Sequence, residues 1–453
     1  MTERLIVIGG DAAGMSAASQ ARRRRPVDDL EILVFERSSY VSYSACGEPY
    51  YVGGYITDID QLQARTPAEF AAMDIVVHTR HEVVALDPPA GQVRVRHLAA
   101  GTEDTYGYDL LMYTTGATAF MPPITGLDLA GVHVMRTLDD ALAVRRLLTQ
   151  GARQAVVVGG GYIGLEVAEA LHHQGVKTRV LTKEATVLDR TLDPDMGALV
   201  TDRMREIGIE VHTGIAVHSL EGVDGRVARV DCPGGTCFEA DLVVLGLGTR
   251  PEVELAKEAG LPLGKTGAVV VNARQQTPLE GIWAAGDCAE AWHRVAQRPV
   301  NIHLGTIANK QGRVAGINIG GEYATFPGVL GTAITKVCEL EIARTGLSEA
   351  EATAAGLLYS VGTLDSTTTA GYWPEAQPMR LKVLAECGTS RLLGAQIVGG
   401  PGAGKRIDVF ATALWNNMRA DDLMDVDLSY APPFSPVWEA VLIAARKAWE
   451  ASR

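Results

Sequence analysis

The chain has 453 residues, of which 47% are hydrophobic and 21% charged, and its formal net charge is −13. This length is about three times the roughly 150 residues of a usual domain, so two to four domains are expected, and the balanced composition excludes disordered and collagen-like chains. An acidic surface repels phosphate backbones and anionic lipids, so we expect neither nucleic acid nor a membrane as a partner.

No apolar run approaches the roughly 18 residues that a membrane span needs, and the first expected strand starts at Leu5, with no room for a signal peptide. Six cysteines are too few for a disulfide framework. We therefore expect a cytoplasmic protein with reduced cysteines. The 49 glycines are a surplus, and they cluster at two places where a backbone can approach a phosphate.

The N-terminal segment predicts a strand, a tight turn and a helix. Residues 5–8 are apolar, residues 9–14 read Gly-Gly-Asp-Ala-Ala-Gly, and a helix-forming stretch continues through Arg25. A second strand at residues 30–35 ends at Glu36, about 22 residues beyond the turn, where a carboxylate can accept from ribose hydroxyls. This pattern indicates a βαβ nucleotide-binding unit.

The same pattern returns about 150 residues later. Residues 155–158 are apolar, residues 159–164 read Gly-Gly-Gly-Tyr-Ile-Gly, a helix is expected as far as Gly175, and a strand follows at residues 178–181. One such motif is weak evidence, but two copies, each between a strand and a helix, predict two dinucleotide sites. In the first copy Asp11 takes the place of the middle glycine, where a side chain would crowd a pyrophosphate.

The last third of the chain has a different sequence pattern. An apolar strand at residues 280–287 ends in Gly286-Asp287, and a helix is expected at residues 305–319. Asp287 can accept from a ribityl hydroxyl or, alternatively, cap a helix. Beyond Pro327, alternating stretches at residues 380–384 and 392–398 and a helix at residues 406–418 predict an α+β domain.

Three further segments carry a family resemblance: Ser-Tyr-Ser-Ala-Cys-Gly-Glu-Pro-Tyr-Tyr at 42–51, Lys-Arg-Ile-Asp-Val at 405–409 and Tyr-Ala-Pro-Pro-Phe at 430–434. From end to end, the chain resembles the flavoprotein pyridine nucleotide-disulfide oxidoreductases, in the single-cysteine branch of coenzyme A disulfide reductases and NADH oxidases. The resemblance implies an α/β, glutathione-reductase-like fold with two Rossmann-like domains and a C-terminal α+β dimerisation domain. The implied domains are 1–117 with 246–325 for FAD, 118–245 for NAD(P)H, and 326–453 for the homodimer interface.

The resemblance also implies the cofactor sites. FAD would lie on the first unit, against Gly9, Gly14, Glu36, Arg37, Val83, Thr115, Gly116 and Asp287. NAD(P)H would lie on the second unit, against Gly159, Gly161, Gly164 and Lys183. The strand of the second unit ends Leu-Thr-Lys, without the carboxylate that usually binds the 2′-hydroxyl of NAD, so NADPH is the preferred nicotinamide and NADH a second one.

Cys46 is the predicted redox centre. Glutathione-reductase-like enzymes carry a second cysteine five residues further, but here that residue is Tyr51. The second atom of the redox pair must then come from a mixed disulfide, a sulfenic acid or a persulfide. Cys46 is near the start of a predicted helix, which favours a thiolate, although a buried inert cysteine is the alternative. The other cysteines lack the spacing of zinc ligands, and we expect no metal.

The resemblance assigns two tyrosines of the partner subunit, Tyr372 and Tyr430, to the catalytic sulfur as proton donors. Alternatively, they pack at the interface and make ordinary hydrogen bonds. The histidine that NADH peroxidases of the branch carry in the first glycine turn is here Ala12.

Four residues match the family's ligand contacts: Ser16, Gln20, Arg23 and Ser42. They and the arginine run 22–25 favour coenzyme A, whose phosphates arginines bind well. Ala45, Asp74 and Trp438 stand where known coenzyme A disulfide reductases carry Asn, Lys and Lys, so another thiol is an open alternative.

The leading functional prediction is an FAD-dependent NAD(P)H:disulfide oxidoreductase that reduces coenzyme A disulfide or a related low-molecular-weight disulfide or persulfide through Cys46. One alternative is an NAD(P)H oxidase that passes electrons to oxygen. Another is a flavin-bearing redox-sensing protein that binds a partner without turnover.

Overall fold

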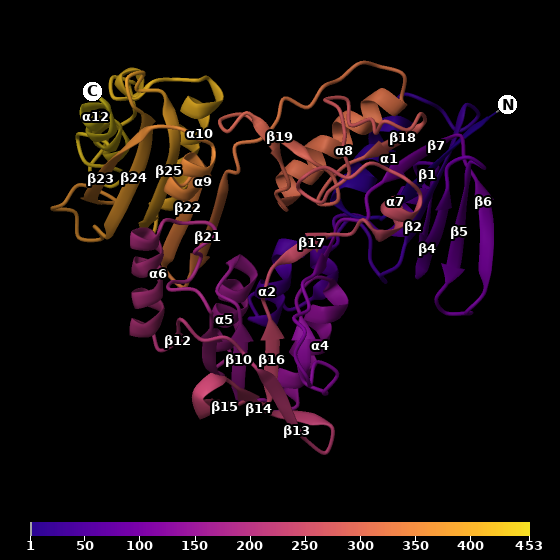
Figure 1. Cartoon of the computed structure of the whole chain (residues 1–453), viewed down its shortest axis with the longest axis horizontal. Coiled ribbons are helices and arrows are strands. Elements are labelled where there is room, and N and C mark those ends of the chain that lie inside the picture. Colours follow the sequence, from indigo (N-terminus) through magenta and orange to yellow (C-terminus); the bar gives the residue numbers. More distant parts are fainter. Residues whose placement is uncertain (1) are drawn as a thin grey trace.

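The computed structural model describes residues 2–453, which form three lobes (Figure 1). The lobe around the N-terminus contains a five-stranded sheet in the order β18-β7-β1-β2-β3, with every neighbouring pair parallel. Its strands are β1 (Glu3–Ile8), β2 (Leu30–Glu36), β3 (Ile75–Thr79), β7 (Leu110–Tyr113) and β18 (Ile282–Ala284). The sheet therefore joins the first residues of the chain to a strand some 280 residues later.

Helices cover one face of this sheet and a second sheet covers the other. Helices α1 (Ala12–Arg22) and α8 (Gly305–Ile319) pack against each other, with α1 alanines closely facing α8 glycines. The opposite face meets the antiparallel strands β4 (His81–Asp87), β5 (Gln92–His97) and β6 (Glu103–Gly107). Parallel strands buried on both faces read as continuous apolar runs, which is why residues 5–8 and 30–35 were recognisable.

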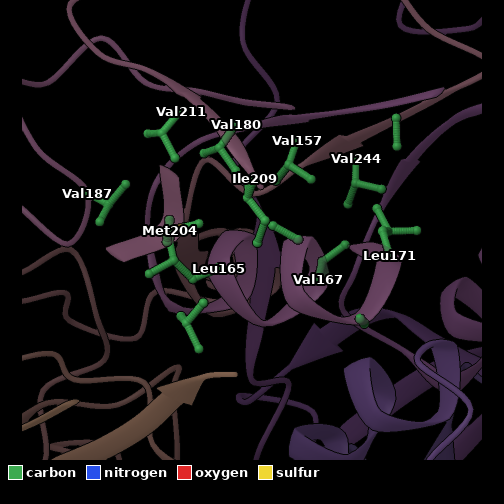
Figure 2. Packing of buried hydrophobic residues seen from close by; sticks show 14 of the residues in the cluster. Val157, Leu165, Val167, Leu171, Val180, Val187, Met204, Ile209, Val211 and Val244 are labelled. Atoms are coloured by element: carbon green, nitrogen blue, oxygen red, sulfur yellow. The ribbon is translucent and has the colours of Figure 1, made fainter. Parts of the chain in front are cut away.

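The middle lobe repeats this plan. Its parallel sheet has the order β12-β11-β10-β16-β9. The strands are β9 (Val132–Val134), β10 (Gln154–Val158), β11 (Lys177–Leu181), β12 (Glu210–His212) and β16 (Leu242–Leu245), and the helices are α4 (Leu138–Thr149), α5 (Tyr162–His173) and α6 (Pro194–Glu206). Figure 2 shows the core between sheet and helices, where Val157, Val180 and Val244 face Leu165 and Leu171. Antiparallel strands β13 (Ser219–Val223), β14 (Arg226–Asp231) and β15 (Cys237–Glu239) cover the other face.

The C-terminal lobe has one antiparallel sheet in the order β21-β22-β25-β24-β23. The strands are β21 (Ala333–Val337), β22 (Leu340–Gly346), β23 (Tyr359–Thr367), β24 (Pro378–Glu386) and β25 (Leu392–Gly399). Helices α10 (Ile407–Trp415) and α12 (Ala440–Ser452) pack on the sheet and enclose an apolar core. The predicted α/β class with a C-terminal α+β domain is confirmed.

Short elements complete the chain: α2 (Glu48–Val52), α3 (Pro67–Ala71), α7 (Glu254–Glu258), α9 (Glu349–Ala354), α11 (Ala420–Leu423), β8 (Ala117–Ala119), β17 (Thr249–Pro251), β19 (Ala291–His293) and β20 (Arg298–Val300). Within residues 2–453, no helix combines the length and the apolar character needed to cross a bilayer.

Several boundaries differ from the sequence prediction. Helix α1 ends at Arg22 instead of Arg25, since a residue that precedes a proline, here Pro26, disfavours the helical conformation. The strand expected at residues 280–287 is only Ile282–Ala284, because glycines with positive φ flank it: Gly281 (73°) and Gly286 (82°). Helix α10 spans Ile407–Trp415 instead of residues 406–418, and Asn417 beyond it has φ 54°.

Candidate active site

Both glycine turns and Cys46 open onto one cavity of about 1960 Å³ between the lobes. Pockets for drug-sized ligands measure roughly 300–1,000 Å³, so this cavity has room for more than one such ligand. Most of the predicted cofactor residues line it: Gly9, Glu36, Arg37, Val83, Thr115, Gly116, Asp287, Gly159, Gly161 and Lys183. Cys46 is the one cysteine among the lining residues that the structure describes.

Close packing requires glycine at the first and last positions of both turns. A Cβ at Gly9 would lie 2.2 Å from the Thr114 carbonyl oxygen, and one at Gly159 would lie 2.3 Å from the Gly246 carbonyl oxygen. Both residues also have positive φ, 101° and 114°. Gly14 and Gly164 back directly onto these first glycines, which lets each helix approach its strand.

The middle glycine of the second turn is different. The nearest atom to a Cβ at Gly161 would be 4.0 Å away, so the protein itself does not require glycine here. The turn instead leaves open space at the N-terminus of α5, where backbone N–H groups attract a pyrophosphate. The second unit therefore fits a dinucleotide on the evidence of its own packing.

The acidic residue at the end of β2 is held in place by the backbone. The Glu36 carboxylate accepts from the N–H groups of Gly10 (2.8 Å) and Ser38 (2.7 Å). A carboxylate has about four acceptor positions, so capacity remains for ribose hydroxyls. Arg37 lies 3.8 Å from Glu252, whose backbone carbonyl accepts from the Thr115 hydroxyl at 2.6 Å.

Asp287 follows β18 and contacts a positively charged side chain that the sequence did not predict. Its carboxylate pairs with the Arg136 guanidinium at 3.1 Å. Helix α8 has Leu304 at its N-cap, so Asp287 does not cap it, and the alternative interpretation of Asp287 is wrong. Arg136 lies in the loop before α4, about 150 residues from Asp287 along the chain, and no local sequence motif predicts this contact.

Cys46 lies in a single 3₁₀ turn, residues 45–47, before α2. Its side chain is exposed to the cavity, yet the surrounding protein partly desolvates it, and this raises the pKa of the thiol, with further contributions from Glu166 and Glu48. The Cys46 backbone N–H opposes this shift and favours the thiolate. Helix α2 has five residues and begins only after Cys46, so its dipole is weak there.

One buried and one half-buried carboxyl group beside Cys46, Glu48 and Glu166, were also missed. Glu48 is 2% exposed, and its Oε1 has no hydrogen-bond partner. Burial raises the pKa of Glu48 to about 8, reinforced by Asp140. Glu166, on α5, accepts from the Thr335 hydroxyl at 2.8 Å, and burial raises its pKa as well. The only sequence signal for Glu48 is an acidic residue two positions after the cysteine within an otherwise apolar segment.

Positively and negatively charged side chains both line the part of the cavity beside the second glycine turn. Lys183 lies just beyond β11 with 67% of its side chain exposed, and its ammonium is 3.6 Å from the Glu184 carboxylate. Both residues line the cavity, together with Arg190. Glu184 is a carboxylate two residues beyond Thr182, the position that corresponds to Glu36 in the first unit.

The four predicted thiol-binding residues lie apart from this cavity. Ser16 donates to the Asn309 side chain (2.8 Å), and Gln20 accepts from Arg24 (2.8 Å). Arg23 is exposed, and Ser42 has φ 49°, in the left-handed region.

The arginine run is largely satisfied internally. Arg22 donates to the backbone carbonyls of Arg25, Leu30 and Asp74, which ties the end of α1 to two loops. Arg24 pairs with Glu322, and Arg25 pairs with Asp29 and Glu3. Within residues 2–453, only Arg23 of the four has no recorded partner, so the run offers one free guanidinium to an anionic ligand.

Tyr372 and Tyr430 lie together on the C-terminal lobe, outside the cavity of the same chain. They are 75% and 45% exposed. Partial desolvation and the neighbouring Tyr372 hydroxyl raise the pKa of Tyr430. Within one subunit the two tyrosines do not line the Cys46 cavity.

Two glycine turns at the carboxyl ends of parallel sheets, one cavity between them and a single cysteine at its wall define an oxidoreductase with two dinucleotide sites. The chain belongs to the pyridine nucleotide-disulphide oxidoreductase family, whose model matches residues 3–312, and the dimerisation domain of that family matches residues 332–441. It is accordingly an enzyme that uses FAD and NAD(P)H.

Individual relatives are similar over almost the whole chain. A Pyrococcus horikoshii protein named NAD(P)H coenzyme A polysulfide/persulfide reductase is 38% identical over 448 residues, covering 98% of both chains. An NADH oxidase of Methanocaldococcus jannaschii is 34% identical and also covers 98% of both. The solved NAD-dependent persulfide reductase from A. fulgidus has a TM-score of 0.94 and 40% identity, covering 99% of this chain and 83% of that one.

Proposed function

We propose that the protein transfers electrons from NAD(P)H, through FAD, to a low-molecular-weight disulfide or persulfide, with Cys46 as the single redox cysteine. The observation that carries this proposal is that Cys46 is the one cysteine lining a cavity shared by two dinucleotide turns. Gly9, Gly14, Glu36, Arg37, Val83, Thr115, Gly116 and Asp287 would hold FAD, and Gly159, Gly161, Gly164 and Lys183 the nicotinamide dinucleotide. The order of the strands in the two parallel sheets supports the domain division proposed from the sequence.

FAD supplies a two-electron relay between the nicotinamide and sulfur. The chain's own part is to hold Cys46 at the cavity wall, to limit water around the thiol and to keep Glu48 largely protonated nearby, beside Glu166, whose pKa burial also raises. A mixed disulfide at Cys46 accepts two electrons, its S–S bond breaks, and one thiol leaves with a proton. The freed Cys46 sulfur then attacks the next disulfide and expels the second thiol.

The thiol itself is part of the proposal. The names of the P. horikoshii and A. fulgidus relatives favour a persulfide or coenzyme A-linked substrate. In this chain Arg23 is the one unpaired guanidinium of the arginine run, so we propose that binding to the phosphates of coenzyme A is weak and that smaller disulfides or persulfides are also reduced.

We further propose a homodimer in the cytoplasm whose active sites are completed by Tyr372 and Tyr430 of the partner subunit. The dimerisation domain and the exposure of both tyrosines support the dimer. The low cysteine content supports the location.

Intact mass of the purified enzyme, measured with and without dithiothreitol, tests the mixed disulfide and identifies the thiol. An adduct that is lost on reduction and absent from a Cys46→Ser variant supports the proposal. A trapped sulfenic acid without an adduct, together with oxygen consumption that exceeds disulfide reduction, supports the oxidase instead, a function that the M. jannaschii relative's name carries.

A further inference from the structure

Asp11 occupies the middle position of the first glycine turn, which corresponds to Gly161 in the second. The two backbones are alike, with φ −107° and ψ −154° at Asp11 and φ −82° and ψ −178° at Gly161. Both conformations are extended and open to any residue. The side chain at this position is therefore free to serve a purpose of its own.

The Asp11 carboxylate does not cap the helix that it precedes. Its side chain makes no N-capping hydrogen bond, although the adjacent Ala12 N–H lowers the pKa of the carboxyl group. Its Oδ1 instead accepts from the Tyr43 backbone N–H at 3.2 Å. Beside this bond, the Ser42 N–H donates to the Gly10 carbonyl at 2.9 Å. Two hydrogen bonds thus join the glycine turn to the loop that reaches Cys46 three residues later.

This loop needs such support because it is strained. Ser42 has φ 49°, a left-handed conformation that is unfavourable for a residue other than glycine. Strained residues persist only where the surrounding structure over-determines them. The other side of the loop is fixed by Ala64, whose N–H donates to the Ser42 carbonyl, and by Ser44, whose N–H donates to the Leu62 carbonyl, both at 2.8 Å.

We propose that Asp11 is a positioning residue that fixes the Cys46 loop to the FAD-binding glycine turn, so that one element sets the geometry of both the cofactor and the nucleophile. In the second unit, which carries no nucleophile, the same position is Gly161. The importance of this role for turnover rests on the proposed function of Cys46, but the bond can be tested without turnover.

The charges around Asp11 define the pH at which the bond is strongest. Burial and, to a smaller extent, Glu36 at the end of β2 raise the pKa of Asp11 to about 7, against the opposing effects of Arg136 and the N–H groups of Tyr43 and Ala12. The Tyr43 phenol, Glu48 of α2 and the Cys46 thiol are further titratable groups whose pKa values are raised by Asp11. Above this pKa the carboxylate is ionised and its hydrogen bond is charge-assisted.

The test is amide hydrogen exchange of the FAD-loaded enzyme at pH 8, in wild type, Asp11→Gly and Asp11→Asn. Both variants remove the same charge, but only Asn keeps a side-chain oxygen that accepts from Tyr43. We expect exchange of the Tyr43 amide to rise at least about tenfold in the Gly variant, as for loss of one charge-assisted bond, and to stay within about threefold of wild type in the Asn variant. Ser19→Ala, on the same helix and without a recorded side-chain bond, is the control.

Unchanged Tyr43 exchange in the Gly variant would overturn the proposal, and so would equal acceleration in both variants. Amides of β10 and α5 report general loss of folding in the same experiment. As a second readout, kcat for disulfide reduction should fall more in Gly than in Asn, at similar KM. If Cys46 is not the redox centre, this difference in kcat disappears, whereas the exchange result stands, so the two failures are distinguishable.

Discussion

Glu48 follows Cys46 by two positions, is 2% exposed, and buries an Oε1 that no group hydrogen-bonds. Burying an unpaired polar group is unfavourable, and an apolar residue would fill the same place without that penalty. A polar residue that is buried without a hydrogen-bond partner, despite this cost, is usually retained for function. Within reach of the Cys46 thiol, an acid that is protonated at neutral pH can hold a proton for the leaving thiol.

Glu48→Gln should increase stability at high pH. Because the folded-state pKa of Glu48 is raised from 4.5 to about 8, the folded protein keeps a proton that the unfolded chain has lost. The free energy of unfolding of the wild type therefore falls as pH rises through this window, and the loss is complete above pH 8. We expect the Gln variant to be more stable by on the order of 3 kcal/mol at pH 9 and nearly equal to wild type at pH 5. Urea denaturation with FAD bound measures this.

Asp11 also titrates in both proteins, and its coupling to Glu48 is part of the raised pKa of Glu48 that this comparison measures. Glu206→Gln, on the exposed face of α6, is the matched control and should change little at either pH. A stability difference between wild type and the Glu48 variant that does not depend on pH would show that Glu48 is ionised in the folded enzyme.

Lys183→Ala tests the nicotinamide preference at a single side chain. An exposed contact between an ammonium and a 2′-phosphate is worth about 1 kcal/mol, so kcat/KM for NADPH should fall roughly five- to tenfold while that for NADH changes little. Steady-state kinetics with both cofactors measure the change. An equal loss for both, or a gain for NADPH, would contradict the assignment, and Glu184→Gln should shift preference in the opposite direction, toward NADPH.

At the scale of elements, a buried ion network fixes the middle lobe to the C-terminal lobe. Lys382 on β24 is 4% exposed at its side chain and contacts Asp195 (2.7 Å), Asp193 (3.2 Å) and Glu349. Gln396 on β25 adds a hydrogen bond to Asp193 at 2.7 Å. The three carboxylates surround this ammonium where α6 begins, and its single positive charge offsets part of their negative charge. The network thereby holds the nicotinamide lobe in a fixed position against the C-terminal sheet.

Lys382→Met should destabilise the protein by roughly 3–5 kcal/mol, since it leaves the buried Asp193 carboxylate without its cation. Arg380→Met, on the same strand, is the control, because its pair with Asp365 is exposed and worth at most about 1 kcal/mol. Denaturation monitored by flavin fluorescence and by circular dichroism measures the free energy of unfolding of both variants and of wild type. Equal effects of the two substitutions would show that the network does not lock the lobes.

The sequence predicted those elements whose signals are local and missed the contacts that only the fold creates. Helix α8 matches its prediction at residues 305–319, and both glycine turns are where the motifs placed them. Arg136 and Lys382 escaped prediction because their partners, Asp287 and Asp193, lie about 150 and 190 residues away. The proximity of Glu166 to Cys46 was missed for the same reason, because Glu166 lies on α5 in the middle lobe.

At the scale of the whole molecule, the C-terminal lobe carries an exposed apolar surface beside Tyr430: Phe434 (74%), Val437 (68%) and Trp438 (64%). Soluble monomers rarely expose such a cluster, and the dimerisation domain of the family ends at this segment. A single chain places the two tyrosines outside its own cavity, so in the proposed shared active site a second copy would bring them to Cys46.

A dimer assembled from one Cys46→Ser chain and one Tyr430→Phe chain should therefore contain one intact composite site. We expect the mixed dimer, isolated with two affinity tags, to have about half of wild-type disulfide reductase activity, whereas each homodimer is strongly impaired. Light scattering should give about twice the 48.2 kDa of one chain. No recovery of activity in the mixed dimer would contradict a shared site.

The most direct test of the central claim is the Cys46→Ser enzyme, purified with FAD bound and assayed for NAD(P)H-dependent reduction of coenzyme A disulfide, a small disulfide and a persulfide. Among the cavity-lining residues that the structure describes, Cys46 carries the only thiol, so the proposed mixed disulfide must form there. The account predicts that flavin reduction by NAD(P)H persists and that reduction of all three substrates falls at least about a thousandfold, as for loss of a covalent nucleophile. Turnover of any of them at the wild-type rate would contradict it.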